Sequence, residues 1–475
     1  MSTGLTRVTV ATAQRRVDVA LPEQVPLAEL LPEVLRHAGE GLADDGELHG
    51  GWLLRRTDGA PLQANRALVV QGVRDGELLH LVPAQAQWPE LEYDDVVEAI
   101  ADGARRRGAA WSGPATRAAT LVAASVLLAG GLFAVLRAAP ESRLAMLCAL
   151  GTAALLSLAG VVASRAYDDA PAGAGLGAWS MPYAFVGGSA LVSSGDRVGV
   201  LAPVAWVGAP ELLVGSVALL LVAVLGAVGV AAGLRAFAAG VTVGLLGALT
   251  ALLAFVLSAG SAAAILMSVL VCGIGVLPLL AIRFGKLPMP PITLPTGAAA
   301  AEGFTAAGGP LDAARERPER ARVFASVART EELLTGMLIG HALLATTAAL
   351  VLVTAGGFAG WLLTAVSAAA LLLRSRLFVT VRQRVPLVLA GLAGIAVLAT
   401  ALAIGSGEAG LLALTAAGLL LALVTVVAGS TYSRRPPSPY LGRAADLLDT
   451  LMVVSVVPVA CAVLGLYGRA RGLLG

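Results

Sequence analysis

Charged residues are scarce in this 475-residue chain, at 13%, whereas hydrophobic residues make up 57%. A soluble globular protein carries about 25% charged residues, so one water-soluble core cannot account for this composition. Lys and Arg number 33 and Asp and Glu number 31, which leaves a formal net charge of +2. Such a weak overall field gives no reason to expect a nucleic acid as partner.

Cysteine is nearly absent, and Cys148, Cys272 and Cys461 each lie inside an apolar segment. Their spacing matches neither a metal-ligand set nor a disulfide framework, so we interpret them as small buried hydrophobic residues. The N-terminus also lacks the basic and then apolar layout of a cleavable signal peptide. We therefore expect the first apolar span to direct the chain into the membrane.

Motifs that carry catalysis are missing as well. There is no GxxxxGK[ST] loop to hold nucleotide phosphates and no GxSxG nucleophile elbow. His37, His49 and His80 are scattered through the first hundred residues without cysteine or paired acids at ligand spacing. We expect no catalytic residue, no cofactor and no metal, and hence a protein that is not an enzyme.

Residues 1–85 show the patterns of a small α+β domain. Residues 6–11 and 17–21 alternate apolar and polar side chains, which predicts a hairpin. Pro26 suits the first position of a helix with apolar residues at i, i+3 and i+4, which Pro32 either kinks or delays and Gly39 ends. Residues 52–56, 67–70 and 78–82 are predicted strands. The order ββαβββ in about 80 residues predicts a ubiquitin-like β-grasp domain.

The predicted strand 52–56 contains candidate docking residues: Trp52, Arg55 and Arg56. The alternative is that Trp52 belongs to a half-buried strand surface and that the arginines form a solvated edge.

Residues 86–115 form a charged linker in which acids precede cations, as the dipole of a short helix favours. This linker is either a solvated helical spacer or a helix that binds a partner. Its candidate docking residues are an apolar face and a basic cluster: Val96, Val97, Ile100, Arg105, Arg106 and Arg107.

Residues 116–475 contain apolar runs that are long enough to cross a bilayer, which takes roughly 20 residues of helix. The sequence predicts an α-helical membrane domain with eleven spans: 118–136, 144–164, 175–192, 210–234, 236–257, 262–282, 333–354, 358–373, 386–404, 409–429 and 447–467.

Arginine alternates between the loops, and this sets the expected orientation. Cations gather before the first span and in the even-numbered loops, including a long segment at 283–332, so we place these in the cytoplasm. Arg137, Arg143 and Arg197 are exceptions in the other loops. An odd number of spans puts the C-terminus outside, where Arg469 and Arg471 are a small violation of the rule.

Ionisable residues are rare within the predicted spans. Secondary transporters and proton pumps place such residues near the midplane of the membrane. Only His341 lies well inside a span, and with no accompanying acid we interpret it as a hydrogen-bonded residue between helices rather than a proton relay. A transporter of a small molecule or lipid with a regulatory head is the competing class, and it predicts a two-fold hydropathy repeat that we do not find. A membrane enzyme acting on lipid lacks any residue set to carry it.

Several local sequences resemble the EccD family, the polytopic core components of actinobacterial type VII (ESX) secretion systems, and the resemblance covers the whole chain. The marks are Arg165-Ala166-Tyr167, Met181-Pro182-Tyr183-Ala184, Leu287-Pro288-Met289-Pro290-Pro291, Ser438-Pro439-Tyr440, Pro458-Val459-Ala460 and the ending 464–473.

This resemblance implies a non-enzymatic scaffold, paired with a second copy and joined to EccB, EccC and EccE in a hexameric inner-membrane machine. EccC, an FtsK/SpoIIIE-like ATPase, would supply the missing phosphate loop. The head would dock near the membrane-proximal part of that ATPase, and the helices would form a lipid-facing or lipid-filled basket around the export route.

Overall fold

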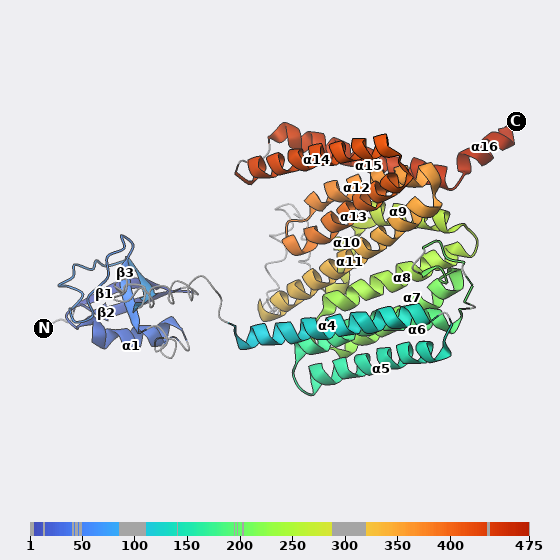
Figure 1. Cartoon of the computed structure of the whole chain (residues 1–475). Coiled ribbons are helices and arrows are strands. Elements are labelled where there is room, and N and C mark those ends of the chain that lie inside the picture. The colour runs from blue at the N-terminus through green and yellow to red at the C-terminus, as the bar shows by residue number, and fades with distance from the viewer. Residues whose placement is uncertain are drawn as a thin grey trace, which may run out of the picture. The chain divides into compact units, whose positions relative to one another are not determined.

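The computed structural model describes residues 4–12, 15–39, 42, 46, 50–84, 111–139, 141–193, 195–196, 198–201, 204–286, 320–434 and 438–474. The chain divides into two compact units, Met1–Trp111 and Ser112–Gly475 (Figure 1). The first unit, the head, is a small sheet with a helix, and the second is a bundle of long helices.

The head sheet has the strands β1 (Leu5–Ala11), β2 (Arg16–Pro22), β3 (Trp52–Arg56) and β4 (Glu77–Pro83). Their order is β2-β1-β4-β3. β1 pairs antiparallel with β2 and parallel with β4, and β3 closes the sheet antiparallel to β4. Helix α1 (Leu27–Ala38) lies in the crossover and ends at Gly39, as expected; Pro32 sits inside it without ending it. This is the predicted β-grasp.

Alternation along the strands builds the core of the head. Val8 and Val10 on β1, Leu54 on β3 and Leu79 on β4 are at most 2% exposed. They pack together with Val34 of α1, so one face of the sheet is covered by the helix. The two-residue period read from the sequence therefore identifies the covered face correctly.

The strand predicted at residues 67–70 is wrong. Leu68 is fully buried, but Val69 and Val70 are 53% and 67% exposed, so the segment does not alternate. The segment forms turns instead. The N–H of Gln71 donates to the carbonyl of Leu68 at 3.2 Å, and the N–H of Gly72 donates to the carbonyl of Val69 at 3.2 Å. One anchoring leucine in a turn replaces the expected strand.

Ten helical segments in the described part of the second unit are long and apolar enough to cross a membrane. They are α4 (Gly113–Ala138), α5 (Arg143–Arg165), α7 (Ala209–Gly229), α8 (Leu234–Ala254), α9 (Ala259–Gly273) continued by η3 (Ile274–Val276) and α10 (Leu277–Gly285), α11 (Arg320–Ala355), α12 (Gly357–Arg374) continued by η5 (Ser375–Leu377), α13 (Val381–Gly405), α14 (Glu408–Arg434) and α15 (Pro439–Val463). A short α16 (Leu466–Leu474) follows.

The third predicted span corresponds to α6 (Ala170–Leu191), a helix rich in glycine, alanine and serine. Its 22 residues cover about 33 Å, which is long enough to cross hydrocarbon. It packs between α5 and α7, and half of its residues are buried by protein. A helix shielded by its neighbours needs less apolar surface, which explains why α6 is less apolar than the ten segments above. Every predicted span thus contains a helix.

Serine or aspartate marks the start of several of these helices. The side-chain oxygen of each accepts a hydrogen bond from the backbone N–H three residues later, which satisfies one of the free donors of the first turn. The capping residues are Ser112, Ser142, Asp169, Ser258 and Ser438.

Glycines let α8 approach its neighbours closely. A Cβ atom at Gly240 would come within 2.2 Å of the Met181 sulfur, and one at Gly244 within 2.8 Å of the Leu220 Cβ. Because α6 and α7 occupy this surface, the Gly240/Gly244 spacing serves packing within the chain.

Helix α4 has no buried residue, and polar bonds attach it to α6. The Trp179 indole donates to the Ser125 hydroxyl at 3.0 Å, and the Tyr183 hydroxyl donates to the carbonyl of Leu128 at 2.8 Å. The Met181-Pro182-Tyr183-Ala184 mark therefore includes a residue that holds the first span in place.

A further tie joins α4 to the start of α6. Arg117 forms an ion pair with Asp169, which also accepts from the N–H of Ala172 at 3.0 Å. The Ala172 hydrogen bond, assisted by the Arg117 guanidinium, holds the pKa of the Asp169 carboxyl below its usual value. Because the folded-state pKa is depressed, the stabilisation by this tie is present at neutral pH and is lost as the pH falls through the depressed pKa.

Two ion pairs fasten α15 to the end of α12. The Arg374 Nε lies 3.5 Å from the Asp449 Oδ1, and their side chains are 17% and 25% exposed. The Arg374 Nη1 also donates to the carbonyl of Val271 at 2.9 Å. Arg376 and Asp446 lie 3.2 Å apart in a more exposed setting. We call the Arg374–Asp449 pair with its Val271 bond the α15 clamp.

The head core predicts a large effect at Leu54. Replacing it by alanine leaves a cavity in a fully buried site, so we expect Leu54→Ala to lower the unfolding free energy of the isolated unit 1–111 by about 2–5 kcal/mol in urea. Leu5, which is 59% exposed, is the matched control, and Leu5→Ala should change the unfolding free energy little. Equal losses in the two variants would contradict the assigned core.

The α15 clamp predicts unequal effects of two neighbouring arginines. Arg374→Gln leaves a partly buried carboxylate without its cation, at a cost of about 1–3 kcal/mol, so the melting temperature of the detergent-purified chain should fall. Arg376→Gln, in the exposed pair, should have a smaller effect. Adding Asp449→Asn to Arg374→Gln should recover part of the loss. No recovery, or a larger loss at Arg376, would refute the clamp.

Candidate functional site

Two of the three candidate docking residues on β3 are held within the head. The Trp52 indole donates to the carbonyl of Leu42 at 2.7 Å and packs against the head core. Arg56 forms an ion pair with Glu77 at 3.2 Å, and its guanidinium also donates to the carbonyl of Gln71 at 2.7 Å. These side chains therefore serve the structure of the head.

Arg55 lies on the opposite face of β3 and is exposed. Its cross-strand neighbour on β4 is His80, and Leu53 is paired in the same way with Val82. None of these apolar residues packs in the head core, because α1 covers the other face. We define the open sheet face as Leu53, Arg55, Leu78, His80 and Val82. It combines an available cation with half-buried apolar side chains.

The candidate docking residues of the linker lie outside the described residues. They are Val96, Val97, Ile100, Arg105, Arg106 and Arg107. Their role stays a prediction.

His341 is buried in α11, with 5% of its surface exposed. The carbonyls of Met337 and Leu270 face the ring, but neither ring nitrogen has a partner in hydrogen-bonding geometry among the described residues. The expected hydrogen bond between helices is therefore not formed. The described residues also hold no cluster of three or more His, Cys, Asp or Glu side chains that could bind a metal ion.

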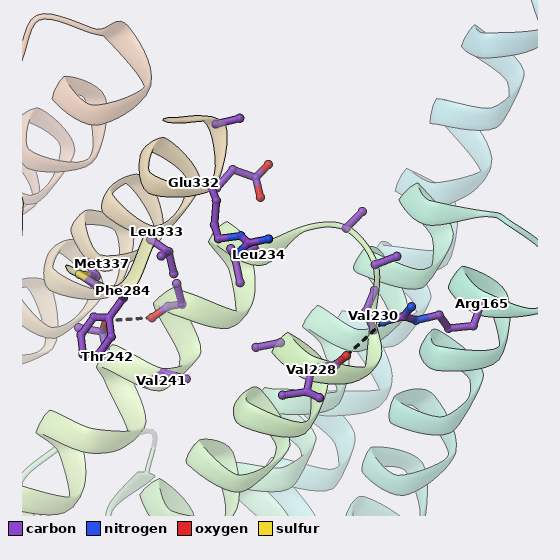
Figure 2. A pocket seen from close by; sticks show the side chains of 16 residues that line it. Arg165, Val228, Val230, Leu234, Val241, Thr242, Phe284, Glu332, Leu333 and Met337 are labelled. Carbon is purple, nitrogen blue, oxygen red and sulfur yellow. Dashed lines mark hydrogen bonds between the residues drawn. The ribbon is translucent and has the colours of Figure 1, made fainter. Parts of the chain in front are cut away.

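Arg165 fixes the turn between α7 and α8. Its Nε donates to the carbonyl of Gly229 at 2.9 Å and its Nη2 to that of Val228 at 3.3 Å, while Ser164 accepts from the N–H of Ala231 at 2.9 Å. These carbonyls end α7 and have no partner within the helix. Figure 2 shows Arg165 reaching from α5 to this turn. The Arg165-Ala166-Tyr167 mark thus begins with a helix-capping cation.

Beside this turn lies a groove of about 760 Å³ between α7, α8, α10 and α11. Its walls are apolar, with Val241, Phe284 and Met337, and its polar side chains include Glu332 (Figure 2). The groove offers shape and apolar surface, and the residues that line it form no nucleophile, base and oxyanion-donor set.

Sequence reasoning missed the α15 clamp and the groove. Asp446 and Asp449 were visible as acids near a span end, and Arg374 and Arg376 as cations at another. Nothing in one sequence indicates that these two ends meet, because their separation along the chain exceeds 60 residues.

Comparison with known proteins gives matches in both units. Residues 116–473 match the EccD-like transmembrane domain, and residues 5–81 match the YukD protein of the WXG100 protein secretion system. The chain is 30% identical to the ESX-4 secretion system protein eccD4 of Mycobacterium tuberculosis, over 99% of this chain and 98% of that protein. It is also 30% identical to the ESX-3 protein EccD3 of the same organism over 33% of this chain and 35% of EccD3.

Two solved structures share the fold. A chain in the structure of protomer 1 of the ESX-3 core complex aligns with a TM-score of 0.58 and 22% identity, covering 98% of this chain and all of that one. A chain of the MycP5-free ESX-5 inner membrane complex aligns with a TM-score of 0.53 and 20% identity, covering 89% and 99%. With a head and a helical bundle that both match in order, this multi-pass membrane protein belongs to the EccD family.

Proposed function

We propose that the chain is a non-enzymatic membrane scaffold of a type VII secretion complex in the inner membrane. The observation that carries this proposal is the full-length likeness to the ESX-4 secretion system protein eccD4, which spans 99% of the chain. The head and the helical unit follow each other in the order that the two family matches give. A subunit that scaffolds needs interaction surfaces and no reacting groups.

Outward-facing helices supply such surfaces. Neither α4 nor α14 has a buried residue, although both are long and apolar. In the assembly we propose, these helices pack against a second copy of the chain and against EccB-, EccC- and EccE-type subunits, while lipid covers the remainder. The helices together border the export route.

The distribution of arginine supports a cytoplasmic head. Arg165 ends α5, Arg235 lies in the first turn of α8, and α11 begins with a charged segment from Arg320 that precedes its apolar part. Successive spans run in opposite directions, so these ends share one side of the membrane, and a surplus of cations favours the cytoplasm. The C-terminus then lies on the opposite side.

Docking of the secretion ATPase is the proposed task of the head. The open sheet face has Arg55 free to pair with an acidic side chain and apolar neighbours to exclude water around that pair. Trp52 and Arg56 contribute by holding β3 in register, because both are engaged inside the head. The linker residues from Val96 to Arg107 extend this docking surface in our proposal.

The topology predicts that Ser261 and Ser433 lie on opposite sides of the membrane, outside and inside respectively. Single substitutions Ser261→Cys and Ser433→Cys, in a chain freed of its three native cysteines, test this with an impermeant thiol reagent. The reagent should label position 261 in intact cells and position 433 only after the membrane is opened. Labelling of both positions from one side would refute the topology.

The docking proposal predicts that charge reversal on the open sheet face weakens ATPase binding. We expect Arg55→Glu to reduce the ATPase retained on purified complex about tenfold, equivalent to about 1.4 kcal/mol. Arg36→Glu, at an exposed position on α1, is the matched control and should retain the ATPase. Deleting residues 1–85 should abolish secretion and leave the membrane unit inserted.

Wild-type secretion by the truncated chain, with the ATPase still bound, would contradict docking through the head. Equal loss in the Arg55→Glu and Arg36→Glu variants would move the docking surface away from the open sheet face.

A further inference from the structure

A second groove runs between α8, α11 and α13. It has a polar part of about 450 Å³ and an apolar part of about 750 Å³, and both parts are lined by Arg235, Thr335, Val381 and Arg382. Since they share these four residues, the parts form one continuous recess, which we call the α11–α13 groove. It is separate from the groove in Figure 2, although Glu332 borders both.

The polar part contains two arginines. Arg235 lies in the first turn of α8 and Arg382 in the first turn of α13, and both side chains are exposed. Within the described residues neither forms an ion pair or a hydrogen bond, in contrast to Arg165 and Arg374. Close packing sets the position of Arg235, because a Cβ on Gly336 would approach the Arg235 carbonyl to 2.3 Å.

Thr335 lies at the junction of the two parts and is 7% exposed. Many threonines of the described spans, including Thr330 and Thr346 of the same helix, donate to a carbonyl one turn earlier. Thr335 makes no such bond, nor any other among the described residues. Thr335 lines both parts of the groove, so its hydroxyl is available to a polar atom of a ligand there.

The start of α13 adds donors to the polar part. The backbone N–H groups of Gln383 and Arg384 donate to the backbone carbonyl of Thr380, while the first N–H groups of the helix have no partner within it. The Thr380 side chain does not cap the helix. Free backbone donors beside two guanidinium groups favour an anionic group such as a phosphate.

Carboxylates also face the polar part. Glu331 and Glu332 line it together with the two arginines, so the charges of the lining side chains cancel. Pro386 has no N–H to donate to the carbonyl of Arg382, so this carbonyl remains available as an acceptor. A ligand with a phosphate and an ammonium group matches this pattern better than a purely anionic one.

The apolar part of the groove continues from the polar part along two spans. Ile339 and Leu343 of α11 face Val385 and Leu389 of α13 across it. From Thr335 to Thr346 the groove follows α11 for about 16 Å, which is the reach of a long stretch of acyl chain. Thr335 lies just inside the apolar part of α11, where lipid headgroups meet hydrocarbon.

We propose that the α11–α13 groove binds one phosphatidylethanolamine-type phospholipid. The phosphate lies between Arg235, Arg382 and the start of α13, the Thr335 hydroxyl donates to the phosphate or an ester oxygen, and the ammonium faces the carboxylates. One acyl chain fills the apolar part. This site lies within a single chain and is independent of ATPase docking.

Native mass spectrometry of the full-length chain in detergent tests this proposal. Phosphatidylethanolamine and phosphatidylglycerol with the same acyl chains are titrated separately, and the first bound lipid is compared. We expect a preference of at least about fivefold for phosphatidylethanolamine, since one well-placed hydrogen-bonded charge accounts for such a ratio. A preference for phosphatidylglycerol, or no preference, overturns the assignment.

Variants locate the site. The double variant Arg235→Gln/Arg382→Gln should weaken binding of the first lipid about tenfold, and Thr335→Val about threefold. Leu389→Trp fills the apolar part from an exposed position and should block binding even if the double variant folds poorly. Arg384→Gln, on the same helix but outside the groove, is the matched control. Unchanged binding in Leu389→Trp, or a shift in its oligomeric mass without loss of lipid, overturns the proposal.

Discussion

The fold of the helical unit depends on one constraint: in hydrocarbon, each backbone N–H and C=O must find its partner within the protein. Long helices meet this requirement along their length and leave it unmet only at their ends. The ends are therefore where polar side chains matter. Ser112, Ser142 and Asp169 cap helix starts, and Arg165 caps the end of α7.

Attraction between helices in a membrane is weak, because lipid is as apolar as leucine. Two features of the bundle compensate for this weak attraction. Glycines such as Gly240 and Gly244 bring backbones into close contact, and a few polar bonds tie peripheral helices to the centre. Helix α4 is attached through Trp179 and Tyr183, and α15 through Arg374. Helix α14 has no buried residue, which leaves its surface for lipid or for another subunit.

Much of this architecture follows from the sequence. The apolar runs locate a helix in each of eleven expected spans, and the two-residue period of β1 identifies the covered face of the head. The strand prediction for residues 67–70 is wrong because a run of valine and leucine resembles a strand, whereas tertiary contacts bury only Leu68. Helix α11 begins at Arg320, well before its apolar part, since helix formation needs no hydrophobic side chains where α11 leaves the membrane.

The candidate sites were less predictable than the fold. Among the docking candidates on β3, the sequence could not separate Arg55, which has no ion pair among the described residues, from Arg56, which pairs with Glu77. Alternation places the two on opposite faces, but only the position of α1 shows which face stays open. Likewise, Arg235, Thr335 and Arg382 are far apart in sequence and meet only because α8, α11 and α13 pack together. Contacts of this kind have no local signature.

We propose that this chain works as a structural subunit of a multi-subunit membrane complex. The mass of the particle that a tagged full-length chain forms, when it is extracted from its own membrane in mild detergent, tests this directly. We expect a large particle that contains at least two copies of the chain together with an FtsK-like ATPase. A monodisperse single chain of 47.6 kDa, active in moving a small molecule across vesicles, would contradict it.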